Sequence, residues 1–342
     1  MRGWLAGHPA SAGAGAAGAA VDRAGALDEA GALAEGCGEA APWGMAGRAL
    51  RVQVAQGGAG AEARRLLRAE VAAAPEDTEL AMALATMLGE AGERAEALAV
   101  LDGVAARSGP GRWDVWRLIH GTLLDRWETV RDAAARLGWR LPGEGAVAGS
   151  YELVRLRIEE ADGEASEVWA RRTGPVSAQV LTMAGPGRPQ HYLDEVVFDL
   201  RPIEEGAGAD EDDEGDEGER AALYGAVAIK RRGGMVVYAV DGVHPGEDEL
   251  DELLVALEEM GAEARVMSGP DYALSDPASG EARRGVYVFV AIAPARARAL
   301  DAALSTFAER WGVPVVWPEL LEALGVKKRL RAQHALMEAW GM

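Results

Sequence analysis

The sequence LAMALATMLGEAGERAEALAVL, residues 80–101, decides the fold of the first half of the chain. Its apolar residues follow a helical period on both sides of a polar, glycine-containing turn at residues 89–93, which predicts a helical hairpin. A unit of about 34 residues that folds as helix–turn–helix cannot bury its apolar face alone, so such units stack. The residues that recur at a spacing of thirty-four, and that we predict to pack the repeats, are Leu50 and Leu84, Ala63 and Ala97, and Leu67 and Leu101.

Small residues and prolines mark the inside and the ends of each predicted unit. Ala63 or Ala97 is expected where two helices of a unit cross closely, with a leucine four positions later on the same face. Pro75 and Pro110 follow at the unit ends because proline cannot continue a helix. We therefore predict a stack of αα units over residues 44–142.

These features resemble the tetratricopeptide repeat (TPR) family, whose pattern places a small residue at the close crossing and a proline at the end of the unit. The resemblance covers residues 44–142. It departs from the family in lacking the usual early Trp and Tyr, since Ala81 and Leu88 stand at those positions in the second unit. Armadillo-like or other αα repeats are therefore the alternative to a TPR-like module.

After Pro142 the pattern changes from a helical period to alternation. Val154, Leu156 and Ile158 alternate with charged residues, which is typical of a half-buried strand. Three further short strand-like runs follow, at residues 167–171, 176–183 and 195–200. Several short strands at this spacing predict a small β-sheet or barrel module over residues 150–203.

Strands and helices are easiest to recognise from residue 223 onward. Strands are expected at 227–230 and 235–240, on either side of the Gly233-Gly234 turn. The elements expected next are a helix at 247–260, strands at 263–267 and 286–292, a helix at 295–311 and a strand at 313–316. From Met235 this is the order β-α-β-β-α-β, which predicts a ferredoxin-like domain over residues 223–317. A basic helix is expected over residues 318–342. The fold class is therefore α+β, with several domains.

The second half of the chain loosely resembles an uncharacterised bacterial family that combines a small barrel with a ferredoxin-like domain. The segments that carry this resemblance are Glu167-Val168-Trp169-Ala170 and Leu193-Asp194-Glu195-Val196. The resemblance implies no activity.

Two segments have compositions that predict disorder. Residues 1–43 are rich in Gly and Ala, with little that could pack. An alternative is that the natural start is Met45 and the preceding stretch is an extension of the gene model. Residues 204–222 form an acidic linker, because eight of the ten residues from Asp210 to Glu219 are acidic and repel one another.

Composition limits the classes of partner. The formal net charge of −20 argues against binding to nucleic acid or to anionic lipid, which carry charge of the same sign. A single cysteine, Cys37, excludes disulfides within the chain and metal sites built from several cysteines. No stretch approaches the length of apolar sequence that a membrane span needs. We expect a cytoplasmic protein that does not bind a membrane.

No motif points to a reaction or a cofactor. The string from Gly13 to Gly18 fits the dinucleotide fingerprint, but no strand precedes it and a Gly/Ala-rich segment generates it by chance. None of the five histidines has a second His or Cys at the spacing of metal ligands. Asp241 and His244 could offer ligands together with the acids that follow, but helix capping explains these residues better. We predict no catalytic residue, no cofactor and no metal.

Aromatic residues gather in the third repeat unit, and we predict the partner-binding residues there. An exposed aromatic side chain on a repeat surface often dominates the energy of an interface. Packing within the unit is the competing explanation. The predicted partner-binding residues are Trp113, Trp116, Arg117, His120 and Trp127.

The last domain offers an alternative nucleic-acid face. The segments that contain Tyr238, Tyr287 and Phe289 resemble the paired sheet motifs of RNA-recognition domains, in which exposed aromatics stack on bases. After Arg284-Gly285 the aromatics come second and fourth, whereas the family places them first and third. This offset predicts that Tyr287 and Phe289 point toward the helices.

We therefore expect a non-catalytic interaction or adaptor protein that binds a peptide or helix of another protein on the helical-repeat surface. The alternative is a regulatory protein that binds a ligand or RNA through its ferredoxin-like domain.

Overall fold

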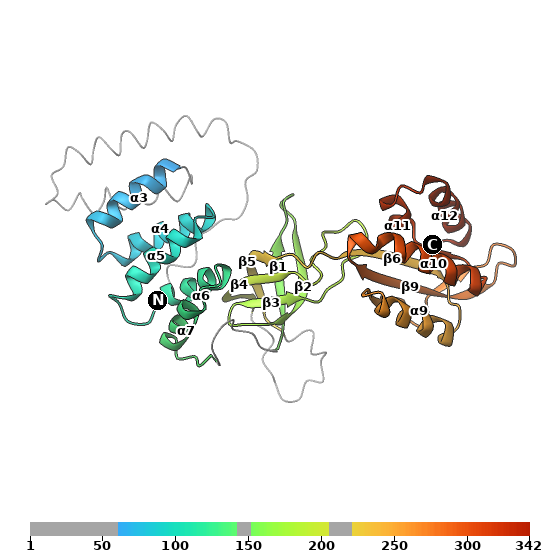
Figure 1. Cartoon of the computed structure of the whole chain (residues 1–342), viewed down its shortest axis with the longest axis horizontal. Helices are drawn as coiled ribbons and strands as arrows, with labels where there is room; N and C mark the ends of the chain where they lie inside the picture. The colour runs from blue at the N-terminus through green and yellow to red at the C-terminus, as the bar shows by residue number, and fades with distance from the viewer. Residues whose placement is uncertain (1–60, 142–151, 205–220) are drawn as a thin grey trace. The chain divides into compact units, whose positions relative to one another are not determined.

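The computed structural model describes residues 61–141, 152–204 and 221–342, which divide into two compact units, before and after residue 142 (Figure 1). The predicted Gly/Ala-rich segment, most of the predicted acidic linker and Leu50 lie outside the described residues. None of the helices in the described part is long and apolar enough to cross a membrane.

The first unit is a stack of helices. Each helix packs on the one that follows it in the chain. The helices are α3 (Ala61–Ala73), α4 (Thr78–Glu90), α5 (Arg94–Ala105), α6 (Arg112–Leu123) and α7 (Trp127–Arg136). Asp77 starts α4 by accepting hydrogen bonds from the backbone N–H groups of Glu79 and Leu80. The predicted helical stack is confirmed, and the starts of α4 and α6, Thr78 and Arg112, lie thirty-four residues apart.

The core of the stack contains four of the six predicted packing residues. Leu67, Leu84, Ala97 and Leu101 are each at most 2% exposed and belong to one apolar cluster. Ala63 falls within α3. The third hairpin crosses at Gly121, where an added β-carbon would lie 2.9 Å from the Val130 side chain.

The second unit begins with a closed five-stranded barrel. Its strands are β1 (Leu153–Glu159), β2 (Ala165–Arg172), β3 (Ser177–Val180), β4 (Glu195–Glu204) and β5 (Leu223–Arg231). Neighbours pair antiparallel, except that β1 and β5 pair parallel and close the ring. The alternating residues Val154, Leu156 and Ile158 point into the barrel core.

The boundary predicted at residue 223 was wrong. Strand β5 was expected at the start of the last domain, but it pairs with β4 and β1 and completes the barrel. The strands on either side of Gly233-Gly234 therefore belong to two different sheets. The alternation of β5 could not show this, because an apolar period of two is the same in a barrel and in an open sheet.

The chain then forms an antiparallel sheet with strand order β10-β6-β9-β7. Its elements are β6 (Val236–Val243), α9 (Glu247–Glu259), β7 (Glu263–Val266), β8 (Ala273–Ser275), β9 (Ala282–Ile292), α10 (Ala297–Trp311) and β10 (Val315–Val316). Helices α9 and α10 share one apolar core with one face of this sheet, through Leu253, Leu300 and Val288.

Two elements differ from the prediction in this region. Strand β8, which pairs with the first part of β9, was not predicted. The single basic helix expected after residue 317 is two helices, α11 (Pro318–Ala323) and α12 (Lys327–Trp340). They are separated at Gly325, whose φ of 70° lies in the left-handed region that ends a helix.

Candidate functional site

Arg117, one of the predicted partner-binding residues, lies inside the third hairpin. Its side chain is 8% exposed and pairs with Asp102 of α5 at 2.7 Å, Asp114 of α6 at 3.0 Å and Asp132 of α7 at 2.8 Å. Burial alone would lower the pKa of Arg117, but the hydrogen bonds to these aspartates outweigh burial and raise it. The guanidinium thus ties three helices together and is not displayed to a partner.

The fully buried Asp114 extends this network. It also accepts from Nε of Arg136 at 2.9 Å, and Arg136 in turn donates to the carbonyl oxygens of Ser108 and Gly109. A buried carboxylate with two guanidinium partners fixes the α5–α6 turn against α7. In the second unit the equivalent position is the apolar Leu80, so the third unit replaces apolar packing with charge pairing.

His120 is also buried, with 2% of its surface exposed. It stacks on Trp116 with a centroid distance of 5.9 Å, and a β-carbon added at Gly89 would lie 2.9 Å from its Cε1. Neither ring nitrogen has a hydrogen-bond partner among the described residues. Burial, followed by the charge of Arg94, lowers the pKa of His120 to about 4, so the ring is neutral at pH 7.

The three tryptophans of the predicted partner-binding set are half-buried. Trp113 and Trp116 pack against the apolar core of the stack. Trp139, which follows α7, is the more exposed tryptophan at 38%. The structure thus assigns much of the aromatic cluster to packing.

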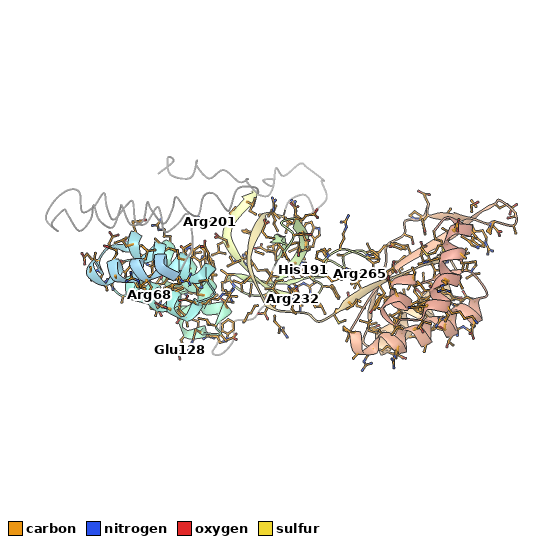
Figure 2. All side chains as sticks on the ribbon, turned by 90° about the horizontal axis from the view of Figure 1, so that it is seen from above. Arg68, Glu128, His191, Arg201, Arg232 and Arg265 are labelled. Atoms are coloured by element: carbon orange, nitrogen blue, oxygen red, sulfur yellow. The ribbon has the colours of Figure 1, made fainter. Side chains whose placement is uncertain are left out.

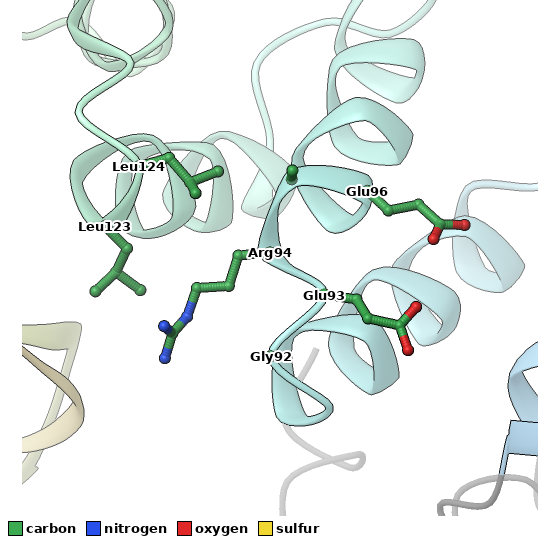
Figure 3. Close-up of a pocket in the computed structure, with 7 residues that line it drawn as sticks. Gly92, Glu93, Arg94, Glu96, Leu123 and Leu124 are labelled. Carbon is green, nitrogen blue, oxygen red and sulfur yellow. The ribbon is translucent and has the colours of Figure 1, made fainter.

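An open cavity of about 390 Å³ lies where α5 begins and α6 ends (Figure 3). It is lined by residues 92–96 together with Leu123 and Leu124. No carboxylate in the described part of the chain pairs with Arg94. The acids at the cavity are already engaged, since Glu93 pairs with Arg64 at 3.0 Å and Glu96 pairs with Arg68 at 2.6 Å.

A buried polar cluster stands at one end of the barrel, and His191 and Arg232 of this cluster are labelled in Figure 2. His191 Nε2 lies 2.8 Å from Glu160 Oε1, and His191 Nδ1 lies 3.0 Å from Asp194 Oδ2. Asp194 also accepts from Arg232 at 2.9 Å and from the Gly233 N–H at 2.7 Å. Burial raises the pKa of Glu160, but hydrogen bonds from Ser166 and His191 hold it below its usual value.

This cluster fastens three turns together. Both ring nitrogens of His191 face carboxylates, Nε2 that of Glu160 and Nδ1 that of Asp194, so the ring links two separate turns. The spacing of His191 and Asp194 in the sequence could have suggested the pair. Glu160 is thirty-one residues away from His191, and no spacing rule connects the two.

The residues of the alternative nucleic-acid face do not share one face of the sheet. Tyr238 packs in the core beneath α9 and α10, whereas Tyr287 and Phe289 lie on the opposite face. The prediction that Tyr287 and Phe289 point toward the helices was wrong. The β-branched residues that alternate with them, Val288 and Val290, take the helix-covered face.

Phe289 is covered by a segment that joins two barrel strands. It is 7% exposed, packs with Met183 and Tyr192, and its Cζ would lie 3.3 Å from a β-carbon at Gly185. Tyr192 also donates its hydroxyl to Glu263 of β7. The Phe289 ring is therefore not available for stacking on a base.

The structure identifies no metal site in the described residues, since no three His, Cys, Asp or Glu side chains converge there. Asp241 accepts a hydrogen bond from the Tyr272 hydroxyl at 2.8 Å, and burial raises its pKa. His244 lies 3.7 Å from Glu247 at the start of α9.

Comparison with known proteins adds little to this picture. No protein-family model and no curated protein matches the chain. A solved structure described as "Novel crystal structure of a hypothetical protein from Neisseria gonorrhoeae" aligns with this chain at 11% sequence identity and a TM-score of 0.23. The alignment covers 49% of this chain and 95% of the chain in that structure. A likeness at that level assigns neither a fold nor an activity to this chain.

Proposed function

We propose that the helical stack binds a peptide or helix of another protein, and that the chain catalyses no reaction of its own. The observation that carries this proposal is the open cavity between α5 and α6. It combines a cation without a described partner, Arg94, with two half-exposed leucines, Leu123 and Leu124. A stack of helical hairpins typically presents such surfaces to other proteins.

The cavity favours a ligand that carries an acidic group beside an apolar one. The first backbone N–H groups of α5 lie at its rim, and no side chain caps them. The helix dipole and Arg94 both attract a carboxylate there. The leucines offer a surface for an apolar side chain. Glu93 and Glu96 oppose this preference weakly, because Arg64 and Arg68 neutralise them.

We also infer the finer type of each module. The thirty-four-residue offset between α4 and α6 supports a TPR-like stack over armadillo-like repeats, whose units are longer. In the C-terminal sheet the first and third strands of a β-α-β-β-α-β order, β6 and β9, are central. That arrangement, with both helices on one face, supports a ferredoxin-like domain.

A display library of random twelve-residue peptides, selected on the full chain, tests the proposed function. We expect enrichment of peptides that pair Asp or Glu with Leu, Ile or Phe. Arg94→Ala should weaken their binding about tenfold, as loss of a charge-assisted contact does. The exposed Arg126 supplies the control, because Arg126→Ala should leave binding unchanged. Peptides that bind both variants like the wild type would contradict the proposal.

The alternative, RNA binding by the C-terminal domain, has weaker support. In its favour, Tyr287 lies on the face away from the helices, beside Phe289 at 5.3 Å. Against it, Phe289 is covered and Tyr238 lies on the other face. Retention of single-stranded RNA that Tyr287→Ala abolishes and rising salt weakens would favour this alternative.

A further inference from the structure

Strand β7 is an outer strand with an open backbone edge. It pairs with β9, and none of the described strands lies on its other side. Met267 donates its N–H to Tyr287 O at 2.7 Å, so residues 267 and 287 form a hydrogen-bonded pair between β7 and β9. Hydrogen-bonded pairs recur every second residue, so Ala264 and Val266 turn their N–H and C=O groups outward. An edge of this kind can accept an additional strand.

A groove runs beside this edge, between α9 and β7, and encloses about 540 Å³. Leu254 and Val255 form its apolar centre, and Val255 is 56% exposed. Asp251 and Glu258 stand at either end of that centre, on the same face of the helix because they are seven residues apart. Val266, 44% exposed, continues the apolar surface along the strand.

The charge of α9 sets the chemistry of the occupant. The helix sequence EDELDELLVALEE contains seven acids and no base. Glu247 and Glu252 are paired with Arg284 and Arg310. Asp251 and Glu258 have no ion-pair partner among the described side chains, whereas Glu263, which also lines the groove, pairs with Arg265 at 2.8 Å. A second copy of this chain would bring another acidic α9 to the same edge, so like charges disfavour self-pairing.

We propose that the β7 edge binds an extended basic segment of another protein, which adds to the sheet as a further strand. Its backbone would bond to Ala264 and Val266, as in other cases of strand addition. Every second side chain of an added strand points to the helix-covered face. In the bound segment, side chains i and i+4 are therefore basic and meet Asp251 and Glu258. Side chain i+2 between them is apolar and meets the Leu254–Val255 centre.

The dimensions of the two elements agree with this assignment. Seven residues of helix advance about 10.5 Å, which is the separation of Asp251 and Glu258 along α9. Four residues of strand advance about 13 Å. The flexible stem of a lysine spans the remaining difference, and its apolar part can lie along the groove wall.

The probe for the experiment is the blocked peptide Lys-Thr-Val-Thr-Lys, added to the isotope-labelled full chain and followed by NMR. We expect amide shifts at Ala264 and Val266. The peptide Glu-Thr-Val-Thr-Glu should bind at least tenfold more weakly. The lysine peptide with N-methyl groups on the amides that face β7 should also bind at least tenfold more weakly, because those amides can no longer donate hydrogen bonds to the strand.

Matched charge reversals on α9 distinguish the effect of the acids in the groove from that of the overall negative charge of the helix. Asp251→Lys with Glu258→Lys should weaken binding at least tenfold. Asp248→Lys with Glu259→Lys makes the same change in net charge at exposed positions outside the groove and should alter binding less than threefold.

Several outcomes would overturn the proposal. The first is an equal loss of affinity from both pairs of charge reversals. The second is equal affinity for the N-methylated and the unmodified lysine peptide. The third is the absence of an amide shift at Ala264 and Val266 when the peptide is added. Self-association of the chain through this edge, seen in sedimentation as a dimer that charge reversal strengthens, would assign the edge to a second copy instead.

Discussion

Gly233 lies so close to Tyr192 that a β-carbon at residue 233 would sit 2.3 Å from the Tyr192 carbonyl oxygen. The Gly233 N–H also donates to Asp194. Because the atoms in the way, the Tyr192 carbonyl oxygen and the Leu193 carbonyl carbon at 2.6 Å, belong to the backbone, we expect Gly233→Ala to lower the free energy of unfolding by about 3 kcal/mol, at the upper end of overpacking costs. Denaturant unfolding, together with amide exchange in β5 and β6, measures the effect.

Gly225 provides the matched control for that substitution. It lies in β5, where an added β-carbon would meet the Ile203 Cδ1 at an ordinary 3.6 Å. Alanine also loses less backbone entropy than glycine in a strand, so Gly225→Ala should leave stability unchanged or raise it slightly. Equal behaviour of the two variants would mean that the close approach at Gly233 does not exist in solution.

Removing Asp114 should loosen the third hairpin. Asp114→Ala leaves Arg117 and Arg136 with fewer partners in a buried site, and loss of one member of a buried charge pair costs about 3–5 kcal/mol. Amide exchange in α6 and α7 should become faster by a corresponding factor. Asp132→Ala removes a 58% exposed partner of the same arginine and should cost less than about 1 kcal/mol. A similar loss from both substitutions would argue against a buried network.

Acid should destabilise the helical stack through His120. Its pKa is about 4 in the folded chain and 6.5 in an ordinary environment, so the unfolded chain binds the proton more readily. The stability that the stack has with neutral His120 is fully present above pH 6.5. As the pH falls toward 4, the free energy of unfolding decreases by up to about 3 kcal/mol. Amide exchange of α4 and α6, recorded from pH 7 to pH 4, follows the loss.

Substitution of His120 isolates this effect. His120→Leu keeps an apolar side chain against Trp116 and Gly89 and should flatten the dependence of stability on pH in that window. His334→Leu, at an exposed position of α12, should leave the pH dependence of the stack as it is. A stack that loses stability with acid equally in the His120 variant would assign the dependence to other groups.

Much of the fold could be predicted because the local patterns are strong. The helical period around Leu84 and Leu101 identified the stack, and alternation at Val154, Leu156 and Ile158 identified the first barrel strand. What alternation cannot specify is the sheet to which a strand belongs or which of its faces is covered. Two of the errors in the second unit, the placement of β5 and the orientation of Tyr287, have this cause.

The candidate site was less accessible to sequence reasoning. Arg117 and His120 were predicted to bind a partner, but both are buried. Asp102 and Asp114 pair with Arg117 inside the stack, and Gly89 leaves space for the His120 ring. The groove beside β7 depends on two elements that meet only in the folded sheet. Sequence shows the acids of α9 but not the open edge next to them.

The parallel pairing of β1 with β5, which closes the barrel, also sets when the barrel can be completed during translation. Arg155 pairs with Leu223, so β1 leaves the ribosome long before its last partner is synthesised. Through that interval the nascent chain carries two unmatched strand edges, on β1 and β4, which are sites for misassociation. Slow elongation before Leu223 would lengthen this exposure, and rapid elongation would shorten it.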